Sequence, residues 1–204
     1  MKKIMTIFGT RPEAIKMAPL VKALEKDAEL EPVVVVTAQH REMLDSVLNT
    51  FDITPCHDLN IMKSGQTLSD ITSKSMVLLE EVIKKESPDM VLVHGDTVTT
   101  FSGSLAAFYN QLPIGHVEAG LRSYDKYSPF PEEMNRQMVG VMADLHFAPT
   151  FNAAKNLLDE GKSSNNVVIT GNTAIDAMNY TINDNYTSQI IDKHRNKKFI
   201  LLTC

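Results

Sequence analysis

Three acidic side chains occur in short polar segments that could bring carboxyl groups together. Asp96 lies in His-Gly-Asp-Thr, Glu118 lies in His-Val-Glu-Ala-Gly, and Glu132 lies in Ser-Pro-Phe-Pro-Glu-Glu. Carboxyl groups gathered in one site can serve as an acid and a base, because neighbouring acids shift each other's pKa values apart. The apolar neighbours of Glu118 favour a functional role for it, because a buried carboxylate among Val, Ala and Gly needs a charged or hydrogen-bonding partner or a part in the chemistry.

The other two acids also have a structural interpretation. Asp96 precedes Thr97, where a helix is predicted to open, and could cap that helix. Glu132 is placed to stabilise a helix start and to pair with Arg136 four residues later. Both a catalytic and a structural role therefore stay open for Asp96 and Glu132.

Anion binding is the second chemistry that the sequence suggests, in Gly-Thr-Arg-Pro-Glu at residues 9–13. Thr10 and Glu13 have the spacing of a capping box, so a helix should begin here and offer free N–H groups to a phosphate. Arg11 and Lys16 would add positive charge. The segment is neither a Walker A loop nor a GxGxxG fingerprint, so nothing supports ATP or NAD. The alternative is a well-capped helix with two solvated cations.

A metal-dependent hydrolase is a rival interpretation. His94 with Asp96, and His116 with Glu118, could form a carboxylate–imidazole site. Alternate residues of a strand point to opposite faces, however, so each pair would be split unless its strand has already ended. His146 alternates within a predicted strand and is expected to be a satisfied core residue.

The elements that must position these residues alternate in the βαβ pattern of a parallel sheet. Valine- and isoleucine-rich runs predict strands that are covered on both faces; they span residues 4–8, 33–37, 90–94, 114–117, 145–148, 167–170 and 199–203. Segments with helical spacing predict helices over residues 13–26, 41–49, 67–86, 97–110, 132–143 and 151–160. Thr67, followed three residues later by Asp70, predicts the start of the third of these helices, and Pro88 marks its end. Pro19 should kink the first helix or delay its start. The polar stretch 183–198 is predicted to be a linker.

Composition sets further limits. The 204-residue chain contains 43% hydrophobic and 22% charged residues and has a net charge of −5, which is ordinary for a folded protein and argues against a broad nucleic-acid surface. Cys56 and Cys204 have no metal-ligand spacing and suit a reducing cytoplasm. No stretch approaches the ~20 apolar residues of a membrane-spanning helix. We expect a cytoplasmic protein without membrane or nucleic-acid partners.

Several segments together resemble one family, the non-hydrolysing UDP-N-acetylglucosamine 2-epimerases, in order and spacing. They are Gly-Thr-Arg-Pro-Glu-Ala-Ile-Lys at 9–16, Thr-Ala-Gln-His-Arg at 37–41, His-Gly-Asp-Thr at 94–97, His-Val-Glu-Ala-Gly-Leu-Arg at 116–122, Ser-Pro-Phe-Pro-Glu-Glu at 128–133 and Thr-Gly-Asn-Thr at 170–173. The resemblance spans essentially the whole chain.

The resemblance implies an α/β fold: a Rossmann-like parallel sheet flanked by helices, the first half of a glycosyltransferase-B-like two-domain fold. Residues 1–172 would form the N-terminal nucleotide-sugar domain, 173–198 a connecting helix and linker, and 199–204 the first strand of a C-terminal domain. In the family that second domain supplies most contacts to uridine and diphosphate. Residues 1–204 alone are therefore expected to be inactive, and a non-catalytic nucleotide-sugar-binding fragment is the alternative.

The resemblance also implies an activity: reversible epimerisation of UDP-N-acetylglucosamine at C2, by elimination of UDP through 2-acetamidoglucal and re-addition, without a cofactor or metal. The product, UDP-N-acetylmannosamine, would feed cell-wall or capsule polysaccharide synthesis, and the enzyme would be a homodimer. The implied site residues fall into three groups: catalytic Asp96, Glu118 and Glu132; substrate-binding Arg11, Lys16, Asp96 and Glu118; and Gln39, His40, Gln66 and Arg136 at a possible allosteric UDP-N-acetylglucosamine site.

Overall fold

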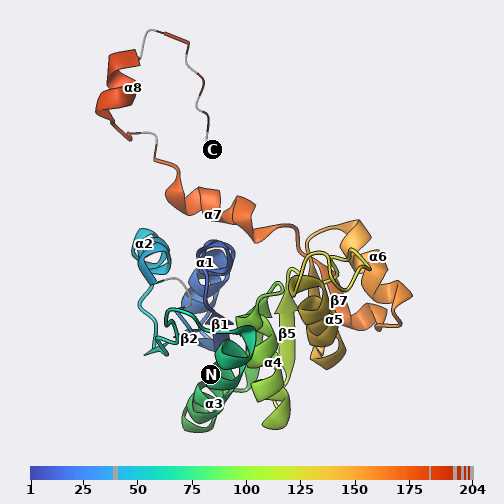
Figure 1. The fold of residues 1–204 in the computed structure, drawn as a ribbon. Coiled ribbons are helices and arrows are strands. Elements are labelled where there is room, and N and C mark those ends of the chain that lie inside the picture. The colour runs from blue at the N-terminus through green and yellow to red at the C-terminus, as the bar shows by residue number, and fades with distance from the viewer. Residues whose placement is uncertain (39–40, 184, 195–196, 199, 201, 203–204) are drawn as a thin grey trace.

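The computed structural model describes residues 1–38, 41–183, 185–194, 197–198, 200 and 202. Within these residues a seven-stranded sheet has the strand order β3-β2-β1-β4-β5-β6-β7, and every neighbouring pair is parallel (Figure 1). The strands are β1 Lys2–Phe8, β2 Leu30–Val36, β3 His57–Asp58, β4 Met90–His94, β5 Ile114–Val117, β6 Leu145–Ala148 and β7 Val167–Ile169. The predicted parallel α/β sheet is therefore confirmed.

The predicted helices are also present, with ends that differ by one or two residues. They are α1 Arg11–Lys26, α2 Arg41–Thr50, α3 Leu68–Glu86, α4 Val98–Tyr109, α5 Glu132–Met142 and α6 Phe151–Asp159. A 3₁₀ turn follows at Ser164–Asn166, and α7 Thr173–Thr181 and α8 Gln189–His194 come after the last strand. The start of α3 is fixed as expected, because Thr67 and Asp70 form a complete capping box.

Three expectations need correction or fall outside the description. Helix α1 does not begin late: it starts at Arg11, because the capping box of Thr10 and Glu13 fixes its start, and it continues through the buried Pro19. The stretch predicted to be a linker contains the short helix α8. The strand predicted over residues 199–203 lies mainly outside the described residues.

Helices cover both faces of the sheet, as the apolar strands predicted. Alternate residues of β1 show this, since Phe8 belongs to one core with α1, α2 and α7, whereas Met5 and Ile7 belong to a second core with α3, α4 and α5. Burying one such side chain contributes roughly 1.5–3 kcal/mol, so the two cores fix the sheet firmly between its helices. No helix among the described residues is long and apolar enough to span a bilayer.

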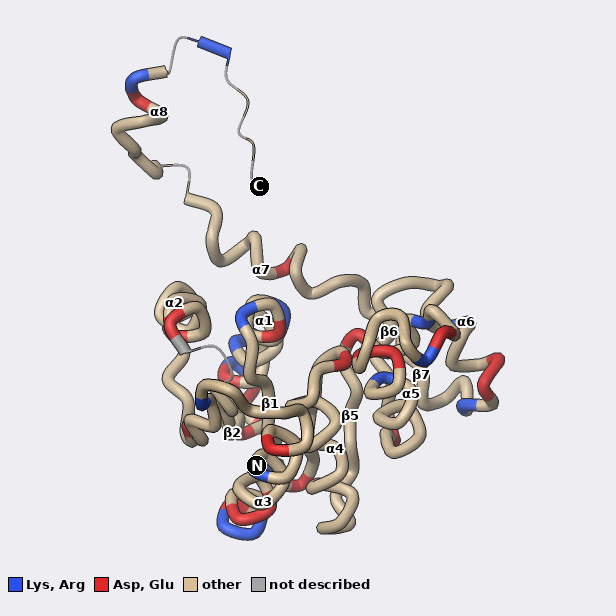
Figure 2. Tube along the Cα trace, viewed as in Figure 1, with Lys and Arg blue, Asp and Glu red and all other residues tan. Residues whose placement is uncertain are grey.

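The strand order reverses direction beside β1, whose neighbours are β2 and β4. In open parallel sheets, ligands bind at the carboxyl ends of the strands next to such a reversal. The segments that follow β1, β4 and β5 all meet at this edge, and they carry Lys16, Asp96 and Glu118. Basic and acidic residues are interspersed along the described trace (Figure 2).

Candidate active site

Lys16 and Glu118 form the central ion pair at this edge. Lys16 projects from the second turn of α1, and its Nζ lies 2.8 Å from Oε1 and 2.5 Å from Oε2 of Glu118. The two side chains are only 24% and 15% exposed. Glu118 has a φ of +60°, a conformation that non-glycine residues adopt at an energetic cost and that is frequent at functional sites. The buried carboxylate therefore has the partner that the sequence required.

Asp96 lies beside a second cation. Its Oδ2 is 2.5 Å from Nη2 of Arg136 on α5, and the side-chain amide of Asn135 donates to its backbone carbonyl at 2.9 Å. The cap of α4 is Thr97, whose hydroxyl accepts from the N–H of Thr100. The interpretation of Asp96 as the helix cap is therefore wrong, and its carboxyl group is left for other chemistry.

Arg136 does not make the pair that its spacing suggested. Within the described structure its guanidinium contacts Asp96 and, at 3.6 Å, Glu133, rather than Glu132. The reason is tertiary: α5 crosses the turn after β4, which brings an aspartate closer than the helix's own fourth-neighbour acid. Glu132 stays half-buried at the first turn of α5.

The three predicted catalytic acids lie within electrostatic reach of one another. Burial raises the pKa of Asp96, and the positive charge of Arg136 partly offsets this rise. The negative charges of Glu132 and Glu118 raise the pKa further, and the positive charge of Lys16 lowers it. The structure thus brings Asp96, Glu118 and Glu132 together from three separate elements. Acids in such a cluster can hold different protonation states at one pH, which acid–base chemistry on two faces of a substrate requires.

Glu13 joins the turn after β1 to the start of α4. It is 2% exposed, and its Oε2 accepts from the backbone N–H groups of Gly9 at 2.9 Å and Thr10 at 2.8 Å. Its Oε1 accepts from the hydroxyls of Thr97 at 2.6 Å and Thr100 at 3.2 Å. Burial raises the pKa of Glu13, and these hydrogen bonds oppose the rise. The start of α1, the helix that carries Lys16, and the segment between β4 and α4, which carries Asp96, are therefore tied together by one buried carboxyl group.

The same contacts correct an expectation about phosphate binding. The predicted capping box is present, but it occupies the N–H groups of Gly9, Thr10 and Glu13. Pro12 has no N–H group, so in the described part of the chain the first turn of α1 leaves only the amide of Arg11 unpaired. The Arg11 side chain is exposed and makes no ion pair with any described residue. Anion binding here would depend on the cationic side chains more than on the helix end.

His94 lies beneath the carboxylates in an uncharged form. It is 3% exposed, neither ring nitrogen makes a hydrogen bond, and Nε2 is 3.9 Å from Oε2 of Glu118. Burial, helped by the charge of Lys16, lowers the pKa of His94 from 6.5 to about 3. The ring therefore lies beside Glu118 without a positive charge at neutral pH.

The histidines of the rival metal site are divided by the sheet. Val93 is the register partner of His116, and His94 is the partner of Val117, so His94 and His116 point to opposite faces. His116 instead contacts the carbonyl of Gly95 at 2.7 Å. In the described ranges no group of three or more His, Cys, Asp or Glu side chains is arranged to hold a metal ion. His146 is buried as expected, but its Nδ1 has no partner, so it is not a fully satisfied core residue.

The residues assigned to an allosteric site are only partly described. Gln39 and His40 lie outside the described residues. Gln66 accepts from the N–H of Lys63 at 2.5 Å, directly before the cap of α3. Arg136 lies among the carboxylates that were predicted to be catalytic, as given above.

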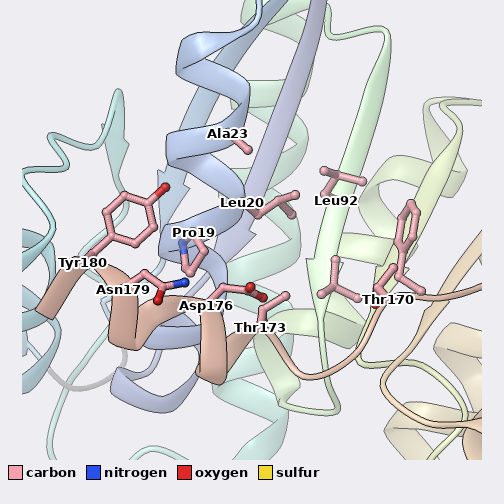
Figure 3. A pocket seen from close by; sticks show the side chains of 11 residues that line it. Pro19, Leu20, Ala23, Leu92, Thr170, Thr173, Asp176, Asn179 and Tyr180 are labelled. Atoms are coloured by element: carbon pink, nitrogen blue, oxygen red, sulfur yellow. The ribbon is translucent and has the colours of Figure 1, made fainter. Parts of the chain in front are cut away.

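A separate apolar pocket of about 530 Å³ lies between α1, the sheet and α7. Figure 3 shows Pro19 and Leu20 of α1 facing Asp176, Asn179 and Tyr180 of α7 across it. Its lining includes none of the acidic and basic residues predicted to bind substrate or to act in catalysis, so it is not part of the candidate site.

Sequence reasoning missed two residues that shape the site, Asn135 and Glu133. Glu133 is fully buried and accepts from the backbone N–H groups of Ser123 and Tyr124. The available signal was helical spacing: Glu133 precedes Arg136 by three residues and therefore lies on the same face of α5.

Comparisons with known proteins identify the family of this chain. The family model described as UDP-N-acetylglucosamine 2-epimerase matches residues 22–204. A protein of that name from Bacillus subtilis (strain 168) is 62% identical over 201 residues, which are 98% of this chain and 53% of the relative. The chain thus spans about half the length of the curated relatives it matches.

Solved structures give the same family and the same coverage of about half of each chain. The S. aureus MnaA–UDP co-structure has a TM-score of 0.92 and 77% identity, and the match covers 97% of this chain and 52% of that one. The UDP-GlcNAc 2-epimerase from Neisseria meningitidis bound to UDP-GlcNAc has a TM-score of 0.85 and 54% identity, and the match covers 87% of this chain and 48% of that one. A lipopolysaccharide galactosyltransferase, at 12% identity and a TM-score of 0.60, shares the fold alone and supports the expected glycosyltransferase-B-like class.

The predicted segments, the parallel fold and the family model all point to the same group of proteins. The chain belongs to the UDP-N-acetylglucosamine 2-epimerase family.

Proposed function

We propose that the full-length protein interconverts UDP-N-acetylglucosamine and UDP-N-acetylmannosamine by inverting C2 of the sugar. The observation that carries this proposal is the gathering of Asp96, Glu118 and Glu132 beside Lys16 and Arg136 at the carboxyl ends of β4 and β5. Relatives at high identity have solved structures with UDP or UDP-GlcNAc, which supports a nucleotide sugar as the substrate.

The reaction needs carboxyl groups and a cation for a chemical reason. The C2 proton is not next to a carbonyl, so its removal is difficult unless the C1–O bond breaks in the same process. A carboxylate takes the C2 proton, UDP departs from C1 with the electron pair, and 2-acetamidoglucal forms. Re-addition of UDP at C1, with a proton delivered to the other face of C2, gives the epimer. Acids held in different protonation states can perform both transfers.

Lys16 and Arg11 would stabilise the negative charge that develops on the departing diphosphate. Lys16 is already directed at the carboxylate cluster, and the exposed Arg11 lies at the start of the same helix. A hydrogen bond from a charged group contributes roughly 1.5–3 kcal/mol, and each 1.36 kcal/mol changes a rate about tenfold. Two such contacts can therefore account for a rate difference of about 10² to 10⁴.

We further propose that activity requires the second half that the relatives possess. The cluster lies at an edge of the sheet, and a second domain would close over it and exclude water. In this proposal residues 1–172 are the first domain, and 173–198 connect it to the second, which begins at 199. The full-length enzyme would act in the cytoplasm as a homodimer and supply cell-surface polysaccharide synthesis. Allosteric activation through Gln39, His40, Gln66 and Arg136 is part of the same proposal.

The test is exchange of the C2 proton. The full-length protein incubated with UDP-N-acetylglucosamine in deuterated water should place deuterium at C2 of both epimers, measured by NMR. Binding of the nucleotide sugar without exchange at C2 would instead indicate a non-catalytic binding protein.

A further inference from the structure

Helix α5 holds residue 96 at two points. The side-chain amide of Asn135 donates to the backbone carbonyl of Asp96 at 2.9 Å, and Arg136 Nη2 lies 2.5 Å from the carboxylate Oδ2. Asn135 is 6% exposed and the Arg136 side chain is 12% exposed, so both contacts are shielded from water. The main chain and the side chain of Asp96 are therefore fixed by consecutive residues of one helix.

Arg136 is in turn held by Glu133. The Oε2 of Glu133 is 3.6 Å from Nη1 of Arg136, one helical turn away. Burial raises the pKa of Glu133, but hydrogen bonds from Ser123, Gln137 and Tyr124 outweigh it, and the net pKa is lowered. An anion fixed in this way orients a guanidinium well, because it leaves the arginine few alternative positions.

We propose that Arg136 is a positioning residue that keeps Asp96 in one orientation and in its ionised form, ready to exchange a proton with the sugar. The inference rests on the proposed function, since it assigns Asp96 a part in proton transfer. Arg136 itself would act through Asp96.

The charges around Asp96 explain why one arginine matters. Charged groups that face Asp96 come from three elements: Arg136 and Glu132 from α5, Glu118 from the turn after β5, and Lys16 from α1. His94 at the end of β4 is uncharged at neutral pH. Lys16 is already bonded to Glu118. Without Arg136, Asp96 would therefore be a partly buried acid beside two other acids, and its pKa would rise further.

The experiment follows the ionisation of Asp96 directly. Full-length protein labelled with ¹³C at aspartate carboxyl groups is titrated by NMR, and the signal lost in Asp96→Asn is assigned to Asp96. Loss of an opposite charge at this distance should raise the midpoint in Arg136→Met by about 1–3 pH units. Arg136→Lys keeps the charge and should remain close to the wild type. Arg136→Gln, which keeps polarity, tests the same expectation if the methionine variant does not fold.

A matched control is Arg122→Met. The side chain of Arg122 is fully buried, and it pairs with Glu160 at 2.7 and 2.8 Å rather than with Asp96. Its loss should leave the Asp96 midpoint unchanged. An unshifted midpoint in both Arg136→Met and Arg136→Gln, or an equal shift in Arg122→Met, would overturn the proposal.

The second readout is the pH dependence of C2 exchange. In Arg136→Met the acidic limb of the kcat/KM profile should shift to higher pH by the same amount as the NMR midpoint. A midpoint that moves while the limb does not would remove Asp96 ionisation from catalysis. If the wild-type protein shows no exchange at all, the proposed function fails, whereas the titration still decides whether Arg136 controls Asp96.

Discussion

Asp96 and Glu118 each lie beside one cation, Arg136 and Lys16 respectively, and each follows a strand of the central sheet. This arrangement lets both carboxyl groups reach one substrate without the two acids pairing with the same cation. Positioned acid–base groups typically contribute about 10² to 10⁴ to a rate. Their removal should therefore be detected far more readily in turnover than in stability.

The first prediction concerns these two acids. In the full-length protein, Asp96→Asn and Glu118→Gln should each lower kcat for C2 exchange by at least about 10², because each removes a proton-transfer group. Circular dichroism and thermal melting should show a retained fold. Asp159→Asn, which alters an exposed acid paired with Lys155 on α6, is the matched control and should keep normal turnover. Near-normal rates in both site variants would exclude these acids from the mechanism.

The second prediction concerns the buried histidines. Burial lowers the pKa of His94 and His116 to about 3 and that of His146 to about 4. Below the unfolded value near 6.5 the unfolded chain binds protons that the folded chain does not, so stability falls as the pH drops. Each histidine contributes up to about 1.4 kcal/mol per pH unit in this range.

Urea unfolding between pH 7 and 4 measures this slope. His94→Gln should reduce it by up to about 1.4 kcal/mol per pH unit, because one buried titrating ring is removed. His194→Gln, on the short helix α8 and away from the core, should leave the slope as it is. If the two variants have equal slopes, burial of His94 does not explain the acid sensitivity.

At the scale of the elements, helix ends are set by local chemistry. The box of Thr67 and Asp70 at α3 is exposed, so its contribution to stability can be measured without disturbing a buried core. Thr67→Ala should lower the free energy of unfolding by about 1 kcal/mol, because it leaves the N–H of Asp70 without its acceptor. Ser73→Ala, inside the same helix, should be neutral or slightly stabilising. Chemical unfolding that shows the reverse order would contradict the assignment of the cap.

Hydrogen bonds from two buried acids link turns and helices that are distant in the sequence. Glu13 bonds to the turn after β1 and to the first turn of α4, and Glu133 bonds to the loop after β5 while it holds Arg136. Each buried acid therefore belongs to one helix and positions the loop of another. The site is consequently supported by side chains that do not themselves face the substrate.

At the scale of the whole molecule, the proposed function predicts that this chain supplies one side of a cleft. Residues 1–204 alone should then show negligible C2 exchange and weak UDP binding, because in the proposed mechanism a second domain supplies further contacts to the nucleotide. A full-length protein that contains this sequence, measured at equal concentration, should show C2 exchange in the deuterium assay and UDP binding in calorimetry. Comparable turnover by the two proteins would refute the requirement for a closed two-domain site.

The sequence by itself determined the elements and the family. Short apolar runs predicted β4, β5 and β6 to the residue, because the strands of a parallel sheet are buried on both faces. Two capping boxes predicted where α1 and α3 begin, because capping depends on residues three apart. The spaced motifs predicted the epimerase family, which the family model confirms.

The tertiary structure alone decided how the site residues are paired. It replaced the expected Glu132–Arg136 pair by Asp96–Arg136, and it gave the cap of α4 to Thr97. It also placed His94 and His116 on opposite faces. Local patterns specify only neighbours within about one helical turn or along one strand. Strand order and register bring together residues far apart in the sequence, and those contacts determine which charge each carboxyl group meets.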